Sequence, residues 1–309
     1  MELSLIDLHC DTAYEMHRQN LKLTSNHLAI SLQNAEKFKQ YGQVMALWTS
    51  DQLSDHDGWD ACLSMYSHLS GDPAIIEGRA RICTSCRDMI PSIPSLFLGV
   101  EDLRILDGRL SRLDTLYEMG VRFVTPLWRG ETCIGGSHNT EKGLTSFGRD
   151  AIQKAFSLGM IVDISHASER SADEIFSLAN EVRCPVVATH SNAYDICPVS
   201  RNLRQGQAES IRASGGVVGL NLYPRFLSTD RNDSIERIIP HIEYFLELGF
   251  SGSLCLGCDM DGATLPREIT DLSRLPTLCE LLLQRNYSQT LVSALFFENA
   301  HRFLTQHLK

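Results

Sequence analysis

Hydrophobic residues along this chain concentrate in eight short runs, most of them rich in valine, isoleucine or leucine. The runs occupy residues 3–9, 42–48, 95–100, 121–127, 160–165, 185–190, 216–222 and 253–258. Nearly all of them lack the polar alternation of a half-exposed strand, and this pattern is typical of strands buried on both faces of a parallel sheet. The hydrophobic pattern therefore predicts eight buried parallel strands.

Segments with helical periodicity separate these runs. Four of them have recognisable ends, and we expect helices over residues 114–119, 148–158, 171–180 and 235–248. Gly120, Gly159 and Gly249 each stand where the residue just beyond a helix takes the left-handed conformation. Ser171, followed by Glu174, has the spacing of a capping box and predicts the start of the third helix.

The alternation of strand and helix predicts an α/β fold, a single (β/α)8 (TIM) barrel that spans residues 1–309 as one domain. The sequence contains no internal repeat, low-complexity tract or linker-like change of composition. The chain exceeds the roughly 250 residues typical of this fold, and we expect the surplus as insertions at about 12–40, 51–94 and 129–146. The apolar spacing over 291–308 suits a helix that closes the barrel or one that forms a homodimer interface.

Composition narrows the classes of partner. The 28 Lys and Arg residues against 38 Asp and Glu residues give a net charge of −10, without basic clusters. A surface that binds nucleic acid or an anionic membrane needs such clusters, so neither partner is expected. The N-terminus lacks the pattern of a signal peptide, and no uncharged apolar stretch reaches about 18 residues, which predicts a cytoplasmic protein.

The cysteine pattern indicates a reducing compartment. Ten scattered cysteines predict free thiols and not a disulfide framework. Cys83 with Cys86, and Cys255 with Cys258, have spacings found in metal sites. Cys255 and Cys258 stand three residues apart in a predicted strand, however, so their thiols point to opposite faces and are poorly placed to hold one zinc ion.

Residues with metal-binding side chains stand at the ends of the predicted strands, where the active site of a (β/α)8 barrel forms. They are His9, Asp11, Glu101, His166, His190 and Asp259. His9 and Asp11 are two residues apart in extended chain and therefore point to the same face. Such ligands suit zinc, manganese, iron or cobalt, and six of them exceed the needs of one ion. The set predicts two divalent metal ions, bridged by a carboxylate and a hydroxide.

Six short segments carry a family resemblance that extends over nearly the whole chain. They are LIDLHCDT, FLGVED, GLTSFGRDAIQKAFSLGMIVDISHAS, VVATHSNAYDICPVSRNLR, GGVVGLNLYPRFL and LGCDMDG. In this order they resemble the renal (membrane) dipeptidase family, peptidase family M19 of the amidohydrolase superfamily. The resemblance implies a (β/α)8 barrel of the metal-dependent hydrolase type with a dinuclear zinc site, in agreement with the fold and metals predicted above.

The resemblance also implies a role for each candidate ligand. His9 and Asp11 would bind one metal ion, and Glu101 would bridge that ion to a second. His166 and His190 would bind the second ion. Two metal ions lower the pKa of bound water and so provide a nucleophile for amide hydrolysis near neutral pH.

Further residues match the substrate-handling positions of the family. Asp259 matches the catalytic aspartate, which would take a proton from the attacking water and return it to the leaving amine. Arg201 matches the arginine that receives the free carboxylate of the substrate, and its planar guanidinium suits that bidentate contact. We expect Asn202 to hold Arg201 in place. A clamped carboxylate near the metals limits the chain beyond the scissile bond, which makes a hydrolase a dipeptidase.

One position departs from the family pattern. The mammalian enzymes carry a histidine after the fourth strand that stabilises the tetrahedral intermediate, whereas this chain has Trp128. An indole cannot donate a proton as imidazolium does, so we expect Trp128 to wall the pocket. His138, in the glycine-containing loop that follows, is either a residue that folds over the site or an exposed loop histidine. Tyr223, after the seventh strand, either packs on a substrate side chain or belongs to the core or rim.

The sequence therefore predicts a cytoplasmic zinc metallodipeptidase that holds two Zn²⁺ ions, with Mn²⁺ or Co²⁺ as alternatives. Its substrates would be dipeptides, cleaved by a hydroxide that bridges the two ions. Two alternatives remain open. The same metal core could act on N-acyl amino acids or lactams, because fold does not separate these activities. A catalytically silent metal-binding barrel would predict at least one broken ligand, and none is missing here.

Overall fold

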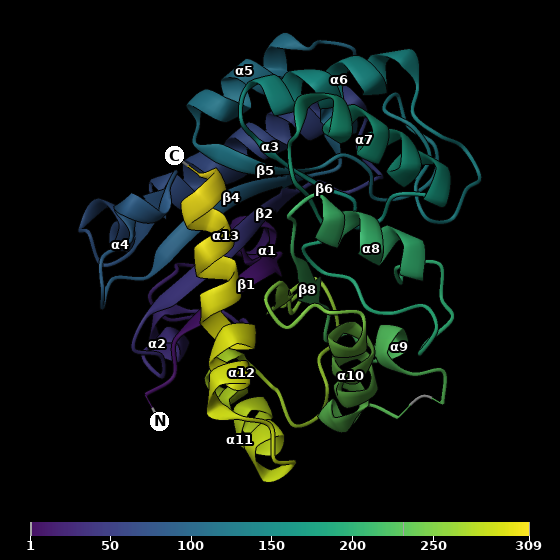
Figure 1. Ribbon diagram of the computed structural model, residues 1–309. Coiled ribbons are helices and arrows are strands. Elements are labelled where there is room, and N and C mark those ends of the chain that lie inside the picture. Colours follow the sequence, from purple (N-terminus) through teal and green to yellow (C-terminus); the bar gives the residue numbers. More distant parts are fainter. Residues whose placement is uncertain (1, 231, 309) are drawn as a thin grey trace.

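Eight parallel strands form a ring at the centre of this computed structural model, which describes residues 2–230 and 232–308 (Figure 1). The strands are β1 (Leu5–Cys10), β2 (Tyr41–Trp48), β4 (Ser95–Glu101), β5 (Val121–Thr125), β6 (Ile161–Asp163), β7 (Val186–Val187), β8 (Val218–Leu220) and β9 (Leu254–Leu256). Neighbours follow the order β7-β6-β5-β4-β2-β1-β9-β8, and a parallel bridge between Ala188 and Val218 joins the two ends. The predicted (β/α)8 barrel is confirmed, and each of the eight predicted strands belongs to it.

Helices surround the ring and bury their apolar faces against it (Figure 1). They are α1 (Thr12–Gln19), α2 (Leu32–Ala35), α3 (Asp55–Ser70), α4 (Pro73–Ile76), α5 (Ser111–Glu118), α6 (Ser146–Ser157), α7 (Glu169–Val182), α8 (Gln205–Ala213), α9 (Pro224–Leu227), α10 (Ile239–Glu247), α11 (Pro276–Gln284), α12 (Gln289–Ser293) and α13 (Asn299–His307). Gly120, Gly159 and Gly249 follow three of them with φ of 95°, 75° and 83°, as expected for residues beyond a helix end. Among the described residues, no helix combines the length and the apolar character needed to cross a bilayer.

A ninth strand was not predicted. β3 (Arg81–Cys83) lies in the segment expected as an insertion at 51–94 and pairs with Ser95–Phe97 of β4. β5 pairs with β4 only from Leu98 onward. The first three residues of β4 therefore extend beyond β5, and β3 supplies the hydrogen bonds that this overhang needs. Its brevity explains why the hydrophobic pattern did not reveal it.

Two helix starts differ from the sequence prediction. The prediction of a capping box at Ser171 was wrong, because Ser168 is the N-cap of α7 and accepts a hydrogen bond from the Ser171 amide. Ser171 is buried, and its hydroxyl donates to the main-chain oxygen of Gly136. The helix predicted over 235–248 is a 3-10 turn followed by α10, which begins one residue before Pro240. Proline lacks an amide hydrogen and fits only the first turn of an α-helix.

The C-terminal segment closes the end of the barrel where the strands begin. α12 continues through a π-helical turn, Ala294–Glu298, into α13. Phe297 and Phe303 pack in one cluster with Ile6 and Phe97, which line the barrel interior. These contacts favour the barrel-closing alternative for residues 291–308, while a homodimer stays a prediction.

The cysteines agree with the sequence interpretation. All ten are free. Cys83 and Cys255 pack in the barrel interior, whereas Cys258 packs in the larger outer core. The two thiols of the Cys255–Cys258 pair thus lie on opposite faces of β9 and its continuation, and they do not share a metal site.

Two glycines allow β7, β8 and β9 to approach closely. A Cβ atom on Gly219 or Gly257 would lie 1.9 Å or 1.7 Å from the main-chain oxygen of Thr189. Any side chain at either position would therefore push the strands apart. His190 follows β7 and Asp259 follows β9, so both stand just beyond the strands that approach closely here.

Candidate metal centre

The six residues predicted at the strand ends meet at one end of the barrel. They are His9 and Asp11 at the end of β1, Glu101 at the end of β4, and His166, His190 and Asp259 after β6, β7 and β9. His166 and Asp259 have φ of 70° and 61°, in the left-handed region that residues other than glycine rarely adopt. Such backbone conformations raise the free energy of the folded chain, and they cluster at functional sites. The fold therefore holds both residues in place against a local backbone preference.

His166 and His190 face the carboxylate of Glu101. Nε2 of His166 lies 3.0 Å from Oε1 of Glu101, and Nε2 of His190 lies 3.5 Å from the same oxygen. The two Nε2 atoms are 2.9 Å apart. Ligand atoms of one tetrahedral zinc ion stand about 3.3 Å from one another, since each lies about 2.0–2.1 Å from the ion. The spacing of these three atoms suits a shared metal ion.

Both imidazoles are oriented through Nδ1. His166 Nδ1 donates to the main-chain oxygen of Trp128 at 3.1 Å. His190 Nδ1 lies 2.8 Å from the hydroxyl of Thr189, and that hydroxyl donates to the buried carboxylate of Asp163 at 2.5 Å. The Thr189 oxygen can then only accept from His190, so Nδ1 of His190 carries the proton. Nε2 of each ring is left with a free lone pair, as in metal-binding histidines.

His9 stands between this group and two further carboxylates. Its Nε2 atom is 3.6 Å from Glu101 Oε2, 3.6 Å from Asp11 Oδ2 and 3.9 Å from Asp259 Oδ1. The residues form two sets, and within each set the ligand atoms lie within 4.8 Å of one another. One set is His9, Glu101 and His190, and the other is His9, Asp11 and Asp259. Because His9 belongs to both sets, they are adjacent, as a site for two metal ions requires.

Three buried atoms of this cluster have no hydrogen-bond partner: His9 Nε2, Asp11 Oδ1 and Glu101 Oε1. The three residues are only 3%, 7% and 2% exposed. An unsatisfied buried polar atom is destabilising by about 1–3 kcal/mol, and a charged one by more. Divalent cations bound among these residues would coordinate such atoms, and imidazole with carboxylate is a donor set that zinc accepts. The residues present therefore fit a metal centre.

Charge crowding shifts the protonation of the cluster. Burial, together with the carboxylate of Glu101, raises the pKa of Asp11 to about 7. Burial also opposes ionisation of Glu101, but the imidazoles of His9 and His166 hold its pKa well below its usual range. Burial lowers the pKa of both His166 and His190. Burial also opposes protonation of His9, but the carboxylates of Glu101 and Asp11 hold its pKa well above its usual value. Ionised Glu101 and neutral His166 and His190 are the forms that bind a cation, and a bound cation would displace the proton of His9 and keep Asp11 ionised.

Asp259 is held by two residues that sequence reasoning missed. Asn221 Nδ2 donates to Asp259 Oδ2 at 2.8 Å. A Cβ atom on Gly262 would lie 1.9 Å from Asp11 Oδ2 and 2.7 Å from Asp259 Oδ1. Asn221 stands at the end of a predicted strand, so its position was a usable signal. The role of Gly262 depends on how the loop after β9 folds back, which no local pattern indicates.

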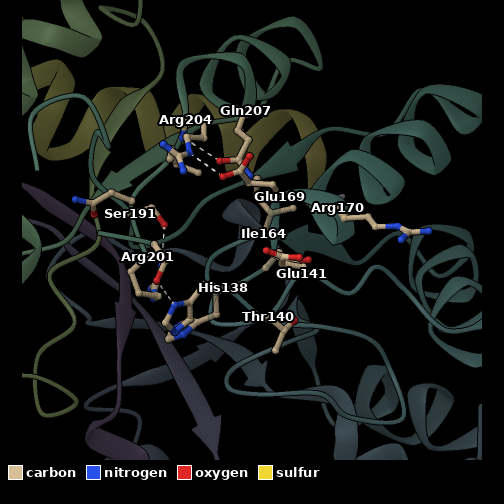
Figure 2. Close-up of a pocket in the computed structure, with 16 residues that line it drawn as sticks. His138, Thr140, Glu141, Ile164, Glu169, Arg170, Ser191, Arg201, Arg204 and Gln207 are labelled. Carbon is tan, nitrogen blue, oxygen red and sulfur yellow. Dashed lines mark hydrogen bonds and ion pairs between the residues drawn. The ribbon is translucent and has the colours of Figure 1, made fainter. Parts of the chain in front are cut away.

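Arg201 lies beside the cluster and lines a pocket next to it. Its guanidinium is buried and donates to the main-chain oxygen of His190 at 3.2 Å and to Ser191 Oγ at 3.4 Å. With His138 and His166, Arg201 lines a pocket of about 290 Å³ (Figure 2). His138 is neutral there, because burial and the charge of Arg201 lower its pKa to about 3.

Asn202 does not hold Arg201, contrary to expectation. Its side-chain amide donates to the main-chain oxygens of Cys197 and Phe226, each at 2.8 Å. Asn202 therefore ties the loop that carries Arg201 to α9, and its effect on Arg201 is indirect.

A separate cleft of about 510 Å³ opens directly above the carboxylates of the cluster. It is lined by Asp11, Glu101, Asp259 and His166, and by the aromatic residues Tyr14, Trp48, Trp128, Tyr223 and Phe226. Trp128 and Tyr223 stand where the sequence analysis placed candidates for a pocket wall. Tyr14, Trp48 and Phe226 were missed, since they come from three segments that only the fold brings together.

Several known proteins are similar to this chain in sequence. The family model for membrane dipeptidases (peptidase family M19) matches residues 1–308. An uncharacterized protein in the pqqA 5' region of Klebsiella pneumoniae is 35% identical over 243 residues, covering 74% of this chain and 89% of that protein. The dipeptidase aclJ of Aspergillus oryzae is 32% identical, covering 64% of this chain and 48% of that protein.

Solved structures resemble the whole chain. A metallo peptidase from Rhodobacter sphaeroides, liganded with a phosphinate mimic of the dipeptide L-Ala-D-Ala, has a TM-score of 0.90 and 25% identity, with full coverage of both chains. The metallo peptidase described as dipeptidase AC, of family M19, has a TM-score of 0.90 and 26% identity, covering 100% of this chain and 99% of that one.

Proposed function

Because this chain belongs to the membrane dipeptidase family, peptidase family M19, we propose that it hydrolyses dipeptides with the help of two zinc ions. The observation that carries the proposal is the cluster of three unpartnered buried ligand atoms at His9, Asp11 and Glu101. The dipeptide mimic bound by the Rhodobacter sphaeroides relative supports the substrate class.

We assign the ligands as the sequence analysis did. His9 and Asp11 would hold one ion, and His166 and His190 would hold the other. Glu101 would serve both, because its Oε2 faces His9 at 3.6 Å while its Oε1 faces His166 at 3.0 Å. When bound, a pair of zinc ions supplies a water molecule acidified to a nucleophile near neutral pH and an electrophile for the scissile carbonyl.

The chain's own residues provide the remaining functions. Asp259 accepts the proton of the attacking water and delivers it to the leaving amine. Asn221 binds Oδ2 of Asp259 and leaves Oδ1 facing His9, so Asp259 has one oxygen free for proton transfer. Arg201 attracts the free C-terminal carboxylate of the substrate, since its buried charge lies beside the cluster. Coulombic attraction is strong there because burial weakens solvent screening.

Substrate comparison tests this function. We expect turnover of free dipeptides to exceed that of their N-blocked forms and of N-acyl amino acids by at least tenfold, which is about 1.4 kcal/mol of transition-state discrimination. Equal rates for free and blocked substrates would instead assign the chain to the amidohydrolases that act on N-acyl amino acids or lactams. Inactivity on every substrate, with metal bound, would support the catalytically silent barrel.

A further inference from the structure

Five aromatic side chains border the cleft above the candidate metal centre, and the proposed chemistry uses none of them. They form two groups. Trp48 contacts both Tyr14 and Trp128, with ring centroids 4.7 Å and 5.0 Å apart. Tyr223 and Phe226 form the other group, with centroids 4.8 Å apart. We call the first group the aromatic wall.

The cleft combines apolar faces with negative charge. All five aromatic residues are only partly buried, so part of each ring is open to a ligand. Among the described residues that line the cleft, none is lysine or arginine, whereas Glu15, Asp259 and Asp261 are acidic in addition to the proposed ligands Asp11 and Glu101. A cleft of this kind accommodates an apolar side chain next to an ammonium group.

The aromatic wall is fixed relative to the metal centre. The main-chain oxygen of Trp128 accepts the hydrogen bond from His166 Nδ1 at 3.1 Å. Next to Trp48, the main-chain oxygens of Thr49 and Ser50 accept hydrogen bonds from the buried guanidinium of Arg104, at 3.4 and 2.7 Å. Arg104 also lies 3.3 Å from Asp102, the residue after Glu101. A wall held this firmly can discriminate between substrates of different shape, because little of the binding energy goes into ordering it.

Arg201 and the aromatic wall lie in different cavities, and His166 is the one described residue that lines both. If Arg201 receives the C-terminal carboxylate, as under the proposed function, the C-terminal residue occupies the side of the metal centre next to Arg201. The N-terminal residue then extends into the cleft, with its ammonium group near the acidic side chains and its side chain against the rings. This step rests on the proposed function.

We propose that the cleft is the subsite for the N-terminal side chain of the dipeptide and that it selects large apolar side chains, aromatic ones above all. An aromatic side chain can bury about 150–250 Å², and aromatic pairs add attraction beyond that area. Even one methylene group in a fitted apolar pocket changes kcat/KM by about 10–200-fold. The aromatic wall therefore determines specificity while the metal centre and Asp259 perform the hydrolysis.

The experiment compares kcat/KM for two series on the zinc-loaded protein. In the first, Gly, Ala, Leu, Phe or Trp precedes a fixed C-terminal Ala. In the second, the same residues follow a fixed N-terminal Ala. We expect kcat/KM for Phe-Ala to exceed that for Ala-Ala by at least about tenfold, with a smaller difference between Ala-Phe and Ala-Ala.

Variants locate the preference. Trp48→Ala and Trp128→Ala should reduce the ratio of Phe-Ala to Ala-Ala to within about threefold of unity, whereas Trp48→Phe and Trp128→Phe should keep most of it. Tyr117→Ala is the control. Tyr117, on α5, contacts Arg122, on β5, and does not line the cleft. Calorimetric affinities of Asp259→Asn for Phe-Ala and Ala-Ala give the same comparison without turnover.

Each outcome bears on one claim. A flat first series, or a preference confined to the C-terminal residue, would overturn the subsite while leaving the dipeptidase function intact. An unchanged ratio in both alanine variants would also overturn it. If no dipeptide is hydrolysed at all, the proposed function fails first.

Discussion

One hydroxyl group links His190 to Asp163. The Thr189 side chain lies 2.8 Å from His190 Nδ1 and donates to Asp163 Oδ2 at 2.5 Å. Asp163 is fully buried and also accepts from the amides of Ser165 and Thr189. This carboxylate therefore fixes which nitrogen of His190 is protonated, although it touches neither the metal centre nor the cleft.

Thr189→Val should weaken zinc binding by about 10–100-fold, because His190 loses the group that fixes its tautomer and orientation. Thr125→Val is a matched control. Thr125 also donates to Asp163 Oδ2, at 2.7 Å, but it is not bonded to His190. Zinc affinity measured by competition with a chelator should fall in the first variant and much less in the second. Equal losses would mean that Asp163 acts through the fold and not through His190.

Gly262→Ala should disrupt the part of the metal centre at Asp11. The new Cβ atom would stand 1.9 Å from Asp11 Oδ2, so the carboxylate or the loop must move. We expect loss of about one zinc ion per chain and a fall in kcat of at least about 100-fold, since small displacements of reacting groups have effects of this size. Gly206→Ala is the control, because a Cβ atom there meets nothing within 4 Å. Full zinc content and turnover in Gly262→Ala would contradict the geometry.

Asp259→Asn separates proton transfer from metal binding. Asp259 lies close enough to His9 and Asp11 to be a ligand, but we propose it as the general acid/base. The variant should keep its zinc and lose about 10²–10⁴-fold in kcat. Asp261→Asn is the comparison, because both carboxylate oxygens of Asp261 already accept hydrogen bonds, from the Thr12 hydroxyl and from the amide of Ala29. Loss of zinc in Asp259→Asn would make Asp259 a ligand instead.

His241 should make the fold sensitive to acid. Its Nδ1 accepts from the amide of Ala193, its Nε2 donates to the oxygen of Leu227, and burial lowers its pKa from 6.5 to about 4. Between these two values the unfolded chain binds a proton that the folded chain does not, so stability falls as pH decreases from about 6.5 to about 4. The contribution approaches about 3 kcal/mol, at 1.36 kcal/mol per unit.

Urea unfolding of metal-depleted wild type and His241→Gln at pH 7, 6 and 5 measures this contribution. The free energy of unfolding of the wild type should decrease more steeply with acidification than that of the variant. Parallel pH profiles would show that His241 does not titrate in this window.

The sequence predicted the barrel and the convergence of the candidate metal ligands for one physical reason. Parallel strands buried on both faces are continuous apolar runs, and the ends of such strands converge in a closed barrel. His9, Glu101 and His190 could therefore be placed together without knowledge of the loops. Metal binding by these residues and the ion that each one binds stay predictions, as do the cytoplasmic location and the homodimer.

The aromatic wall and the supporting contacts could not be predicted in this way. Tyr14 lies on α1, Trp48 at the end of β2 and Trp128 in the loop after β5. Their contact depends on how an insertion, a strand end and a loop fold over one another, and periodicity carries no information on that. Asn202 shows the same limit, since adjacency to Arg201 in sequence suggested a contact that the loop geometry directs to α9.

The zinc content of the purified protein tests the two-metal site most directly. After zinc loading and removal of loosely bound ions, elemental analysis should find about two zinc ions per chain. His190→Ala should retain at most one, whereas His56→Ala, at a histidine with a side chain 61% exposed, should retain both. A wild-type chain that stays free of metal under these conditions, or a His190→Ala variant that binds as much zinc as the wild type, would contradict the account.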